Sequence, residues 1–261
     1  MKVSIIMPAY NEEKRIGDTL RAYSDYFSIV KKKDGLDYEI LVVVNNTTDK
    51  TEEIIRNISK SDKRISYITR VKGGKGYAII EGFREALNGK NDLIGFVDAD
   101  LATPPEAFHA LVRNIGNHGG AIASRWMGGS IIRTKQTLRR RVMSIGFNAL
   151  VRSILLMPYK DTQCGAKLFR KEVIDSIIGE IGITNWAFDV DLIYKTRKKG
   201  FRLKEIPTIW EDKKDSKLNI TRVPFEMFFG LLRVRLLNSP FKGIIRFYNN
   251  LPDWLKVHHK I

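Results

Sequence analysis

The chain has 261 residues, with 45 Lys and Arg against 29 Asp and Glu, and its formal net charge is +16. Hydrophobic residues make up 43%, so the chain can bury a sizeable core and is not expected to be disordered. A single cysteine, Cys164, excludes an intrachain disulfide and a multi-cysteine zinc site. The excess of cations predicts an anionic partner: a nucleic acid, a phosphorylated substrate or an anionic membrane.

Short β-branched runs alternate with helical patterns over the first two-thirds of the chain. Strands are predicted at residues 3–7, 38–44, 65–68 and 93–97, and helices at 12–30, 51–58, 76–87 and from 104 onward. The second run is apolar throughout, as in a parallel strand that is buried on both faces. This alternation predicts βαβ units and a mostly parallel sheet.

The pattern changes beyond about residue 130. Residues 133–141 hold five cations and no acid, and a long helix is predicted at 137–156. Two further strands, at 166–169 and 206–210, are predicted on either side of a helix at 188–199.

The last segment, 222–247, is both apolar and basic. At helical spacing, one face collects the apolar side chains Phe225, Phe228, Phe229, Leu232 and Leu236. Arg233 and Arg235 flank this face, as in a helix that lies on a membrane surface. A helix that packs on the core of its own domain would show the same pattern, so both interpretations stay open.

Four polar clusters follow predicted strands, at residues 8–12, 45–49, 72–76 and 98–100. Ligands bind outside the carboxyl ends of the strands in an open parallel sheet, so these clusters are expected along one rim. Each cluster alone is also explained by turn formation or helix capping.

Asp98 and Asp100 are the most specific of these signals. Two carboxylates after a buried strand can bind Mg²⁺ or Mn²⁺ together with a phosphate ligand. The glycine-rich stretch at 73–76 opens a helix and can cradle phosphate. It matches neither a Walker A loop nor a dinucleotide fingerprint, so alone it indicates a tight turn.

Taken together, these motifs resemble family 2 glycosyltransferases of the GT-A fold. The resemblance is closest to the polyprenyl-phosphate hexose synthases, which include dolichyl-phosphate glucosyltransferases and dolichyl-phosphate mannose synthases. The segments that carry it are Pro8-Ala9-Tyr10-Asn11-Glu12, 46–49, Lys75-Gly76, Asp98-Ala99-Asp100, Ser124-Arg125, Arg140 with Ser144, 161–169, 188–192 and 216–218. The segment 161–169 is typical of the lipid-phosphate branch.

The resemblance implies an α/β fold with a mostly parallel central sheet flanked by helices, followed by the amphipathic helical segment. The catalytic domain would span 1–221, with a nucleotide-sugar half at about 1–125 and an acceptor half at about 126–221, and 222–261 would form the C-terminal segment. The implied reaction is an inverting transfer of a hexose from a nucleotide-sugar to a polyprenyl or dolichyl phosphate. UDP-glucose is the favoured donor and GDP-mannose the next.

The family's site residues carry over to matching positions. The donor would contact Pro8, Ala9, Tyr10, Asn11, Glu12, Asn46, Lys75, Gly76, Asp98, Ala99 and Asp100. Asp100, assisted by Asp98, would hold the divalent cation. The acceptor phosphate would meet Arg125, Arg140, Ser144, Gln163, Ser216 and Lys217. The residues assigned to catalysis are Asp98, Asp100, Arg125, Arg140, Ser144 and Asp161.

Two positions depart from the family pattern. The second strand usually ends in Asp-Asp-Gly-Ser but here ends in Asn45-Asn46-Thr47-Thr48, and an amide donates a hydrogen bond as well as accepting one. Ala102 stands where mannose synthases carry a metal-binding Gln, which favours the glucosyltransferase branch.

Other classes of protein remain as alternatives. A sugar hydroxyl acceptor would need a general base, for which Asp161, Asp189 or Asp191 are candidates. A sugar-nucleotide pyrophosphorylase would need a glycine-rich, Arg-Lys-containing loop where residues 8–12 stand. A nucleic acid is not the expected partner, because no recognition motif accompanies the charge.

Neither a cleavable apolar leader nor a stretch of about 18 uncharged apolar residues is present in the sequence. We therefore expect a cytoplasmic protein, peripheral on the cytoplasmic face of a membrane. It would bind there through its C-terminal segment or through a membrane-protein partner.

Overall fold

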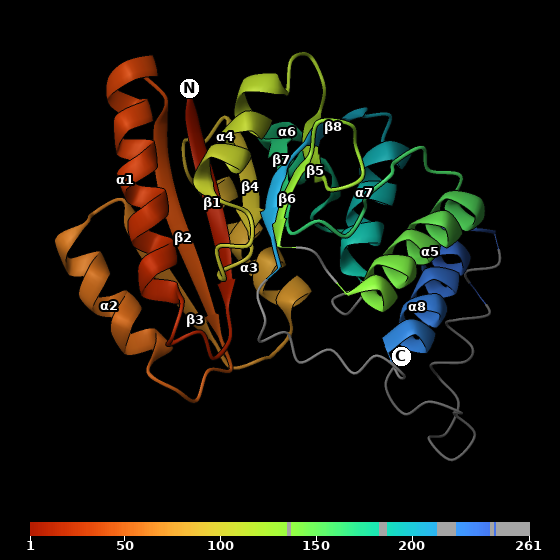
Figure 1. Cartoon of the computed structure of the whole chain (residues 1–261), viewed down its shortest axis with the longest axis horizontal. Coiled ribbons are helices and arrows are strands. Elements are labelled where there is room, and N and C mark those ends of the chain that lie inside the picture. The colour runs from red at the N-terminus through yellow and green to blue at the C-terminus, as the bar shows by residue number, and fades with distance from the viewer. Residues whose placement is uncertain (135–136, 183–186, 213–222, 241–242, 244–261) are drawn as a thin grey trace.

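The computed structural model describes residues 1–134, 137–182, 187–212, 223–240 and 243 (Figure 1). Its seven-stranded sheet has the order β3-β2-β1-β4-β7-β5-β8. The strands of this sheet are β1 Lys2–Ala9, β2 Asp37–Asn45, β3 Ile65–Arg70, β4 Leu93–Val97, β5 Gly120–Ser124, β7 Ala166–Arg170 and β8 Leu203–Pro207. A second, two-stranded sheet pairs β6 Ile131–Thr134 with β9 Ile209–Glu211.

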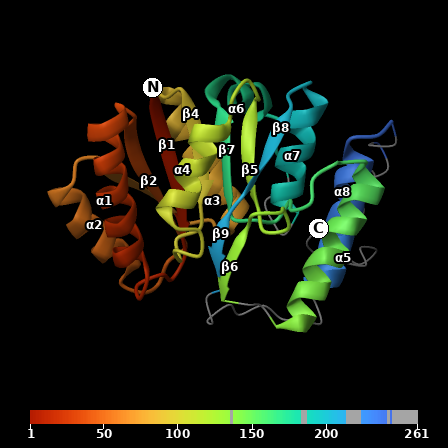
Figure 2. The same cartoon turned by 45° about the horizontal axis from the view of Figure 1, so that its top comes forward.

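Helices cover both faces of the large sheet (Figures 1 and 2). They are α1 Ile16–Asp34, α2 Thr51–Ser61, α3 Lys75–Asn88, α4 Pro105–Asn114, α5 Leu138–Leu155, α6 Lys171–Ile177, α7 Phe188–Lys198 and α8 Val223–Leu237. Adjacent strand residues point to opposite faces, so Ile5 packs in the cluster that contains α1 and α4, and Ile6 in the cluster that contains α3. The predicted α/β fold, with its mostly parallel central sheet flanked by helices, is confirmed.

One strand of the large sheet runs against the others. β7 pairs antiparallel with β4 and with β5, whereas the other pairs in this sheet are parallel. Val97, the last residue of β4, is the partner of Ala166, the first residue of β7. The loop that precedes β7 therefore reaches the same edge as the segments that follow β1, β2 and β4.

The predicted strands and helices are found with shifted ends, except that residues 206–210 do not form one strand. The chain breaks at Thr208 into β8 and β9, which belong to different sheets. The first helix begins at Ile16 rather than at residue 12, and it follows a turn in which the Glu12 carbonyl accepts hydrogen bonds from the amides of Arg15 and Ile16.

The helices α5 and α8 lie side by side at one end of the molecule (Figures 1 and 2). Leu231 and Val234 of α8 are fully buried in the cluster that also contains residues of α5 and α7. On the face of α8 predicted to meet a membrane, Phe229 is 43% exposed. The helix thus packs on its own domain through one face and leaves another partly open.

The outer face of α5 is apolar as well. Leu138, Val142 and Ile145 follow one another at helical spacing and are 76%, 61% and 44% exposed. Arg141 and Arg152 of the same helix are also exposed. None of the helices within the described ranges is long and apolar enough to cross a membrane. The domain boundary predicted at residue 221 falls outside the described residues and stays a prediction.

Candidate functional site

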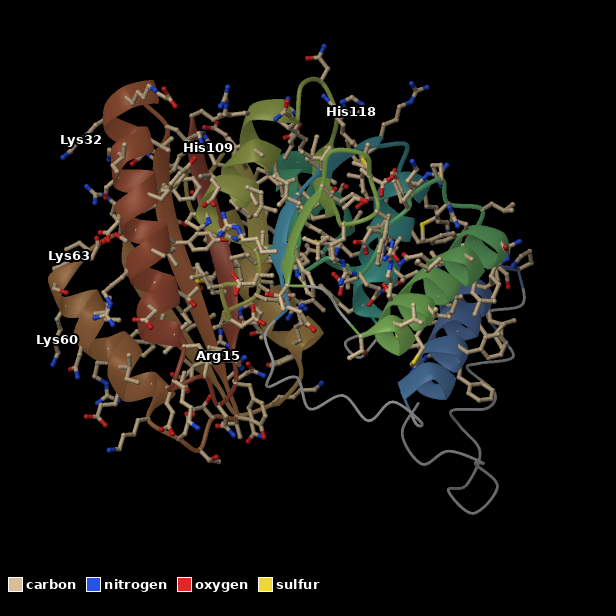
Figure 3. The ribbon with its side chains drawn as sticks, in the orientation of Figure 1. Arg15, Lys32, Lys60, Lys63, His109 and His118 are labelled. Carbon is tan, nitrogen blue, oxygen red and sulfur yellow. The ribbon has the colours of Figure 1, made fainter. Side chains whose placement is uncertain are left out.

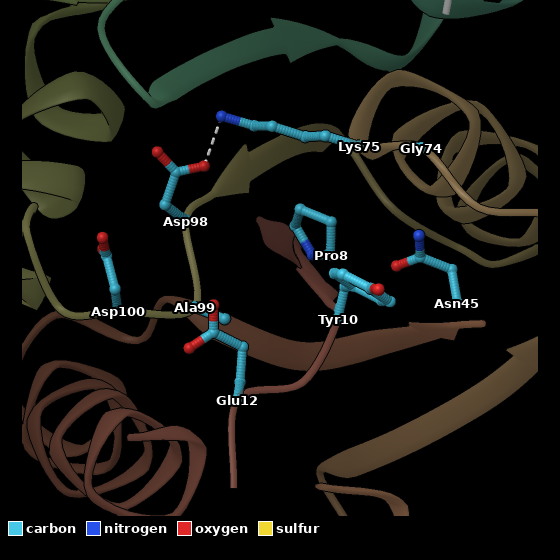
Figure 4. A pocket seen from close by; sticks show the side chains of 9 residues that line it. All are labelled: Pro8, Tyr10, Glu12, Asn45, Gly74, Lys75, Asp98, Ala99 and Asp100. Carbon is cyan, nitrogen blue, oxygen red and sulfur yellow. Dashed lines mark ion pairs between the residues drawn. The ribbon is translucent and has the colours of Figure 1, made fainter. Parts of the chain in front are cut away.

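A cavity of about 560 Å³ opens at the edge where β1, β2 and β4 end (Figure 4). It is lined by Pro8, Tyr10, Glu12, Asn45, Gly74, Lys75, Asp98, Ala99 and Asp100. The structure thus brings together residues at or just after the ends of four strands, β1 to β4, as their positions in the sequence predict. Asn45 and Gly74 also line the cavity, although neither is among the site residues predicted from the sequence.

Lys75 and Asp98 form an ion pair across this cavity, between Nζ and Oδ1 (Figure 4). Lys75 is the first residue of α3, and Asp98 follows β4 directly. Desolvation would lower the pKa of Lys75, but the Asp98 carboxylate outweighs it and raises the pKa above its ordinary value. The charged lysine therefore provides a fixed cation beside the two aspartates.

Asp100 and Glu12 bring further negative charge to the cavity. Burial, together with the nearby Asp98 carboxylate, raises the pKa of Asp100. Burial also raises the pKa of Glu12, although Glu12 Oε2 accepts a hydrogen bond from Arg15 Nε at 2.8 Å. The charges of Asp98 and Asp100 add to this rise in the pKa of Glu12, so a cation between these carboxylates and a diphosphate would relieve their repulsion.

The carboxylates of Asp98 and Asp100 suit a divalent cation whose other ligands are phosphate oxygens and water. The described ranges hold no group of three or more His, Cys, Asp or Glu side chains arranged around a metal position. Asp100 Oδ1 accepts from the Ala102 amide at 2.9 Å, which orients the carboxylate while Oδ2 takes no part in that bond. Mg²⁺ is often held by one or two carboxylates plus substrate phosphate, and Asp98 with Asp100 fit that pattern.

The loop after β1 is fixed by the loop after β2. Asn11 takes a left-handed backbone conformation, with φ of 54°, and its Oδ1 accepts from the Thr48 amide at 2.9 Å. The Glu12 amide donates to Thr51 Oγ1 at 2.7 Å. Asn11 thus connects the two loops rather than lining the cavity, and these bonds hold Tyr10 and Glu12 at the cavity.

Asn45 links two sides of the cavity. With its side-chain amide oriented so that both groups find partners, the nitrogen donates to the Ala9 carbonyl at 2.9 Å and the oxygen accepts from the Gly74 amide at 3.2 Å. A carboxylate could make only the second of these bonds, because it has no hydrogen to donate. The two bonds explain why position 45 carries an amide. Asn46, by contrast, is exposed, and its φ of 51° is a left-handed backbone conformation.

Arg125 and Asp161 form a second, buried cluster. Arg125 Nε and Nη2 donate to the two oxygens of Asp161 at 2.7 and 2.9 Å, and the Arg125 amide donates to Oδ2 at 2.9 Å. The guanidinium also lies over the ring of Trp210 at 5.2 Å. Burial would raise the pKa of Asp161, but the charge and hydrogen bonds of Arg125 lower it below its ordinary value.

The remaining residues predicted for the acceptor are only partly described. Gln163 donates its amide to Asp161 Oδ1 at 3.2 Å, and its side-chain Nε2 is buried without a partner among the described residues. Ser144 lies on α5, and its carbonyl accepts from Asn148 Nδ2 at 2.9 Å. The backbone of Arg140 belongs to α5, but its side chain, Ser216 and Lys217 lie outside what the structure describes.

The other two candidate bases are paired with lysines. Lys167 Nζ donates to Asp189 Oδ1 at 2.6 Å, and Lys195 Nζ donates to Asp191 Oδ2 at 2.7 Å. The side chain of Lys167 is fully buried, and this lysine is not among the site residues predicted from the sequence. The pattern that points to it is a lysine inside the apolar strand 166–169. A lysine that is buried there needs an anionic or polar partner.

Comparison with known proteins gives one family. A family model described as glycosyl transferase family 2 matches residues 4–178. The glycosyltransferase AglD of Haloferax volcanii is 30% identical over 236 residues, which are 89% of this chain and 37% of that protein. A dolichyl-phosphate beta-glucosyltransferase of Saccharomyces cerevisiae is 30% identical over 253 residues, which cover 90% of this chain and 74% of that protein.

Solved structures share the fold. Glucosyl-3-phosphoglycerate synthase from Mycobacterium tuberculosis, in complex with Mn²⁺, uridine-diphosphate and phosphoglyceric acid, superposes with a TM-score of 0.66 at 18% identity, covering 90% of this chain and 77% of that one. A mannosyltransferase from Pyrobaculum calidifontis, in complex with GDP-Man and Mn²⁺, gives 0.60 at 16% identity, with coverages of 94% and 68%.

Proposed function

This chain belongs to glycosyl transferase family 2, and we propose that it transfers glucose from UDP-glucose to a polyprenyl phosphate with inversion at the anomeric carbon. GDP-mannose is the second candidate donor. The names of the curated relatives support a dolichyl-type acceptor and a glucosyl donor. The observation that carries the proposal is the pair Asp98 and Asp100, placed beside Lys75 in one cavity.

The donor's diphosphate is the leaving group, and its growing charge must be stabilised. Asp100, assisted by Asp98, would hold a Mg²⁺ or Mn²⁺ ion, which supplies Lewis-acid stabilisation of the leaving diphosphate. Lys75 stands at the N-terminus of α3, where backbone amides also favour an anion. Tyr10 and Pro8 line the same cavity and would contact the rest of the donor.

The acceptor proposed here needs no general base, because a phosphate monoester is already anionic near neutral pH. The three acids considered as bases are all paired: Asp161 with Arg125, Asp189 with Lys167 and Asp191 with Lys195. Such pairing keeps these carboxylates ionised, and it occupies both oxygens of Asp161 and one oxygen each of Asp189 and Asp191. It supports a phosphate acceptor over a hydroxyl acceptor.

Arg125 would hold the acceptor phosphate, with Asp161 as the group that orients it. The bidentate pair uses Nε and Nη2 and leaves Nη1 for an acceptor oxygen. Arg140, Ser144, Gln163, Ser216 and Lys217 remain proposed partners of that phosphate. Trp210 would keep the guanidinium plane from rotating.

A lipid acceptor places the enzyme at a membrane surface. The exposed apolar residues of α5 and the partly open face of α8 support contact with the bilayer. The cations of these helices support an anionic lipid surface on the cytoplasmic side.

Incubation of the purified chain with UDP-glucose or GDP-mannose, together with dolichyl phosphate and Mn²⁺ or Mg²⁺, tests this function. We expect glucosyl phospholipid from UDP-glucose, with the β configuration if the donor is α-linked. Transfer to glycerol or sugar hydroxyls instead of the lipid phosphate would contradict the proposed acceptor. Product from GDP-mannose alone would contradict the proposed donor.

A further inference from the structure

Gly165 lies directly against the carboxylate of Asp98. A Cβ atom at Gly165 would stand 1.9 Å from Asp98 Oδ2 and 2.6 Å from Asp98 Cγ. Both distances are far inside van der Waals contact. The Asp98 carboxylate therefore occupies the space that the side chain of any other residue at position 165 would need.

This proximity follows from the antiparallel strand. Val97 of β4 is the register partner of Ala166 of β7. The residue after Val97 and the residue before Ala166 are consequently neighbours, although they are far apart in sequence. A segment predicted to serve the acceptor thus contacts a carboxylate predicted to serve the donor.

The loop that carries Gly165 is held on both sides. Lys167 Nζ, fully buried, donates to the Cys164 carbonyl and to Asp189 Oδ1, both at 2.6 Å. Asn148 Oδ1 accepts from the amide and the hydroxyl of Thr162, at 2.9 and 3.0 Å. If a side chain were added at position 165, Asp98 is expected to move rather than the loop.

The second oxygen of Asp98 is paired with Lys75. The carboxylate is thus placed between the loop on one side and the lysine on the other. If it were pushed away from the loop, its charge would swing into the cavity, where the diphosphate of the donor is proposed to bind.

We propose that Gly165 is a positioning residue of the donor site: its missing side chain lets Asp98 stay paired with Lys75 and leaves the cavity open for a nucleoside diphosphate. The inference rests on the proposed function only for the identity of that ligand. Gly95 and Gly120 differ, because there a Cβ would meet the backbone carbonyl oxygens of Lys167 and Leu168, each at 2.6 Å. Substitution at those two positions would strain the sheet itself.

The first experiment compares Gly165→Ala with Gly128→Ala in the full chain. A Cβ at Gly128 would have nothing within 4 Å, so this variant is the matched control. The probe is UDP in the presence of Mn²⁺, with its affinity measured by calorimetry. We expect Gly165→Ala to weaken UDP binding at least about tenfold, because the displaced carboxylate would stand beside the like-charged diphosphate, and Gly128→Ala to leave binding unchanged. Unchanged affinity in Gly165→Ala would overturn the proposal.

A double-mutant cycle separates positioning from general damage to the fold. In the Asp98→Ala background the displaced carboxylate is gone, so adding Gly165→Ala should cause no further loss of UDP affinity. The melting temperature lost on Gly165→Ala should also be largely restored in the double variant. Equal losses in both backgrounds would overturn the proposal, because the loop's own packing would then explain them.

The cycle remains decisive if Gly165→Ala alone does not fold. Folding of the double variant would then support the proposal, and failure of both would overturn it. The melting temperatures do not depend on which substrate the enzyme uses. A native chain that binds no UDP would contradict the proposed donor, while the thermal cycle would still test the contact between Gly165 and Asp98.

Discussion

Asn45 is buried and its neighbour Asn46 is exposed. The same substitution at both positions therefore compares the loss of a buried hydrogen bond with a change at the surface. Asn45 is 2% exposed and donates to the Ala9 carbonyl, whereas Asn46 is exposed. Asn45→Asp would set a carboxylate against that carbonyl oxygen. We expect it to lower the free energy of unfolding by about 1–3 kcal/mol, measured by denaturant titration at pH 7. Asn46→Asp is the control, and an equal loss there would contradict the assignment.

Asp161 balances the buried charge of Arg125. Asp161→Asn keeps the shape but leaves the cation without its partner, and removing one member of a buried pair costs about 3–5 kcal/mol. The lowered pKa of Asp161 means that its contribution is complete above the ordinary value of 3.8 and is lost as the pH falls through the folded-state pKa. The native chain should therefore lose stability on acidification below about pH 4 more steeply than Asp161→Asn. If urea titrations showed the free energy of unfolding of both proteins falling equally steeply below about pH 4, this prediction would be contradicted.

Asp100 is the residue on which metal dependence is expected to rest. Asp100→Ala, or EDTA on the native chain, should abolish transfer, because a lost metal ligand removes several kcal/mol of stabilisation from the leaving diphosphate. Asp18→Ala is the control, since Asp18 is an exposed acid on α1. Full turnover in EDTA would show that the reaction needs no divalent cation.

The cavity is lined by members of the four polar clusters that the sequence shows after its first four strands. The sequence does not predict which side chains pair. Arg125 and Asp161 are 36 positions apart, and Lys167 and Asp189 are 22 apart. Each pair forms only through tertiary packing, so the pattern that identifies Asp161 as a candidate base does not reveal its arginine.

At the scale of elements, α8 packs with a different face from the one its apolar pattern singles out. Leu231 is fully buried against its own domain, and Phe229 is 43% exposed. Leu231→Ala should lower the free energy of unfolding by about 2–5 kcal/mol, whereas Phe229→Ala should change it much less. Thermal and denaturant unfolding of the two variants measure this. Similar losses would contradict the observed orientation of the helix.

The apolar stripe of α5 is expected to contact lipid. Ile145→Glu places a carboxylate at that surface, and Ile29→Glu makes the same change at an exposed isoleucine of α1. We expect Ile145→Glu to reduce co-sedimentation with vesicles that contain anionic lipid, with transfer to a short-chain, water-soluble polyprenyl phosphate retained. Ile29→Glu should bind vesicles like the native chain. Equal vesicle binding by both variants would show that α5 does not contact the membrane.

The strand β5 and the break at Thr208 could not be predicted from the sequence for a common reason. β5 is the five-residue run Gly120–Ser124, whose small side chains give little hydrophobic signal. A Cβ at Gly120 would meet the Leu168 carbonyl oxygen at 2.6 Å, so packing against β7 selects glycine there. The break at Thr208 likewise depends on pairing with β6, which is distant in sequence. Such choices are made by neighbouring strands rather than by local preference.

Across the whole molecule, charge is spread well beyond the cavity. Lys32, Lys60 and Lys63 project outward from the region of α1 and α2, at the opposite end from α5 and α8 (Figures 1 and 3). With a net charge of +16, attraction to an anionic bilayer acts over the whole surface, whereas the apolar contact is confined to one end. Vesicle binding should therefore weaken with rising salt, because surface charges are screened within about 10 Å at 0.1 M. Binding that is insensitive to salt would leave the apolar contact as its main source.

The two predicted halves of the catalytic domain share one sheet. β5, at the end of the predicted nucleotide-sugar half, lies between β7 and β8 of the predicted acceptor half. Neither half can therefore keep its strand neighbours without the other, whatever the exact position of the boundary.

The antiparallel strand β7 also bears on the order of events during folding. β1 to β4 all lie within the first 97 residues, whereas β7 lies some 70 residues beyond β4, so the pair of β4 with β7 cannot close before residue 166 is present. The pair of β1 with β4 and the pair of β4 with β7 both close long segments, whose entropy cost comes before their contacts form. Since Gly165 and Asp161 arrive with β7, a nascent chain that ends before them would hold Asp98 without the loop beside it. On the ribosome, competence to bind a nucleotide would accordingly appear late in synthesis, after most of the first strands have already paired.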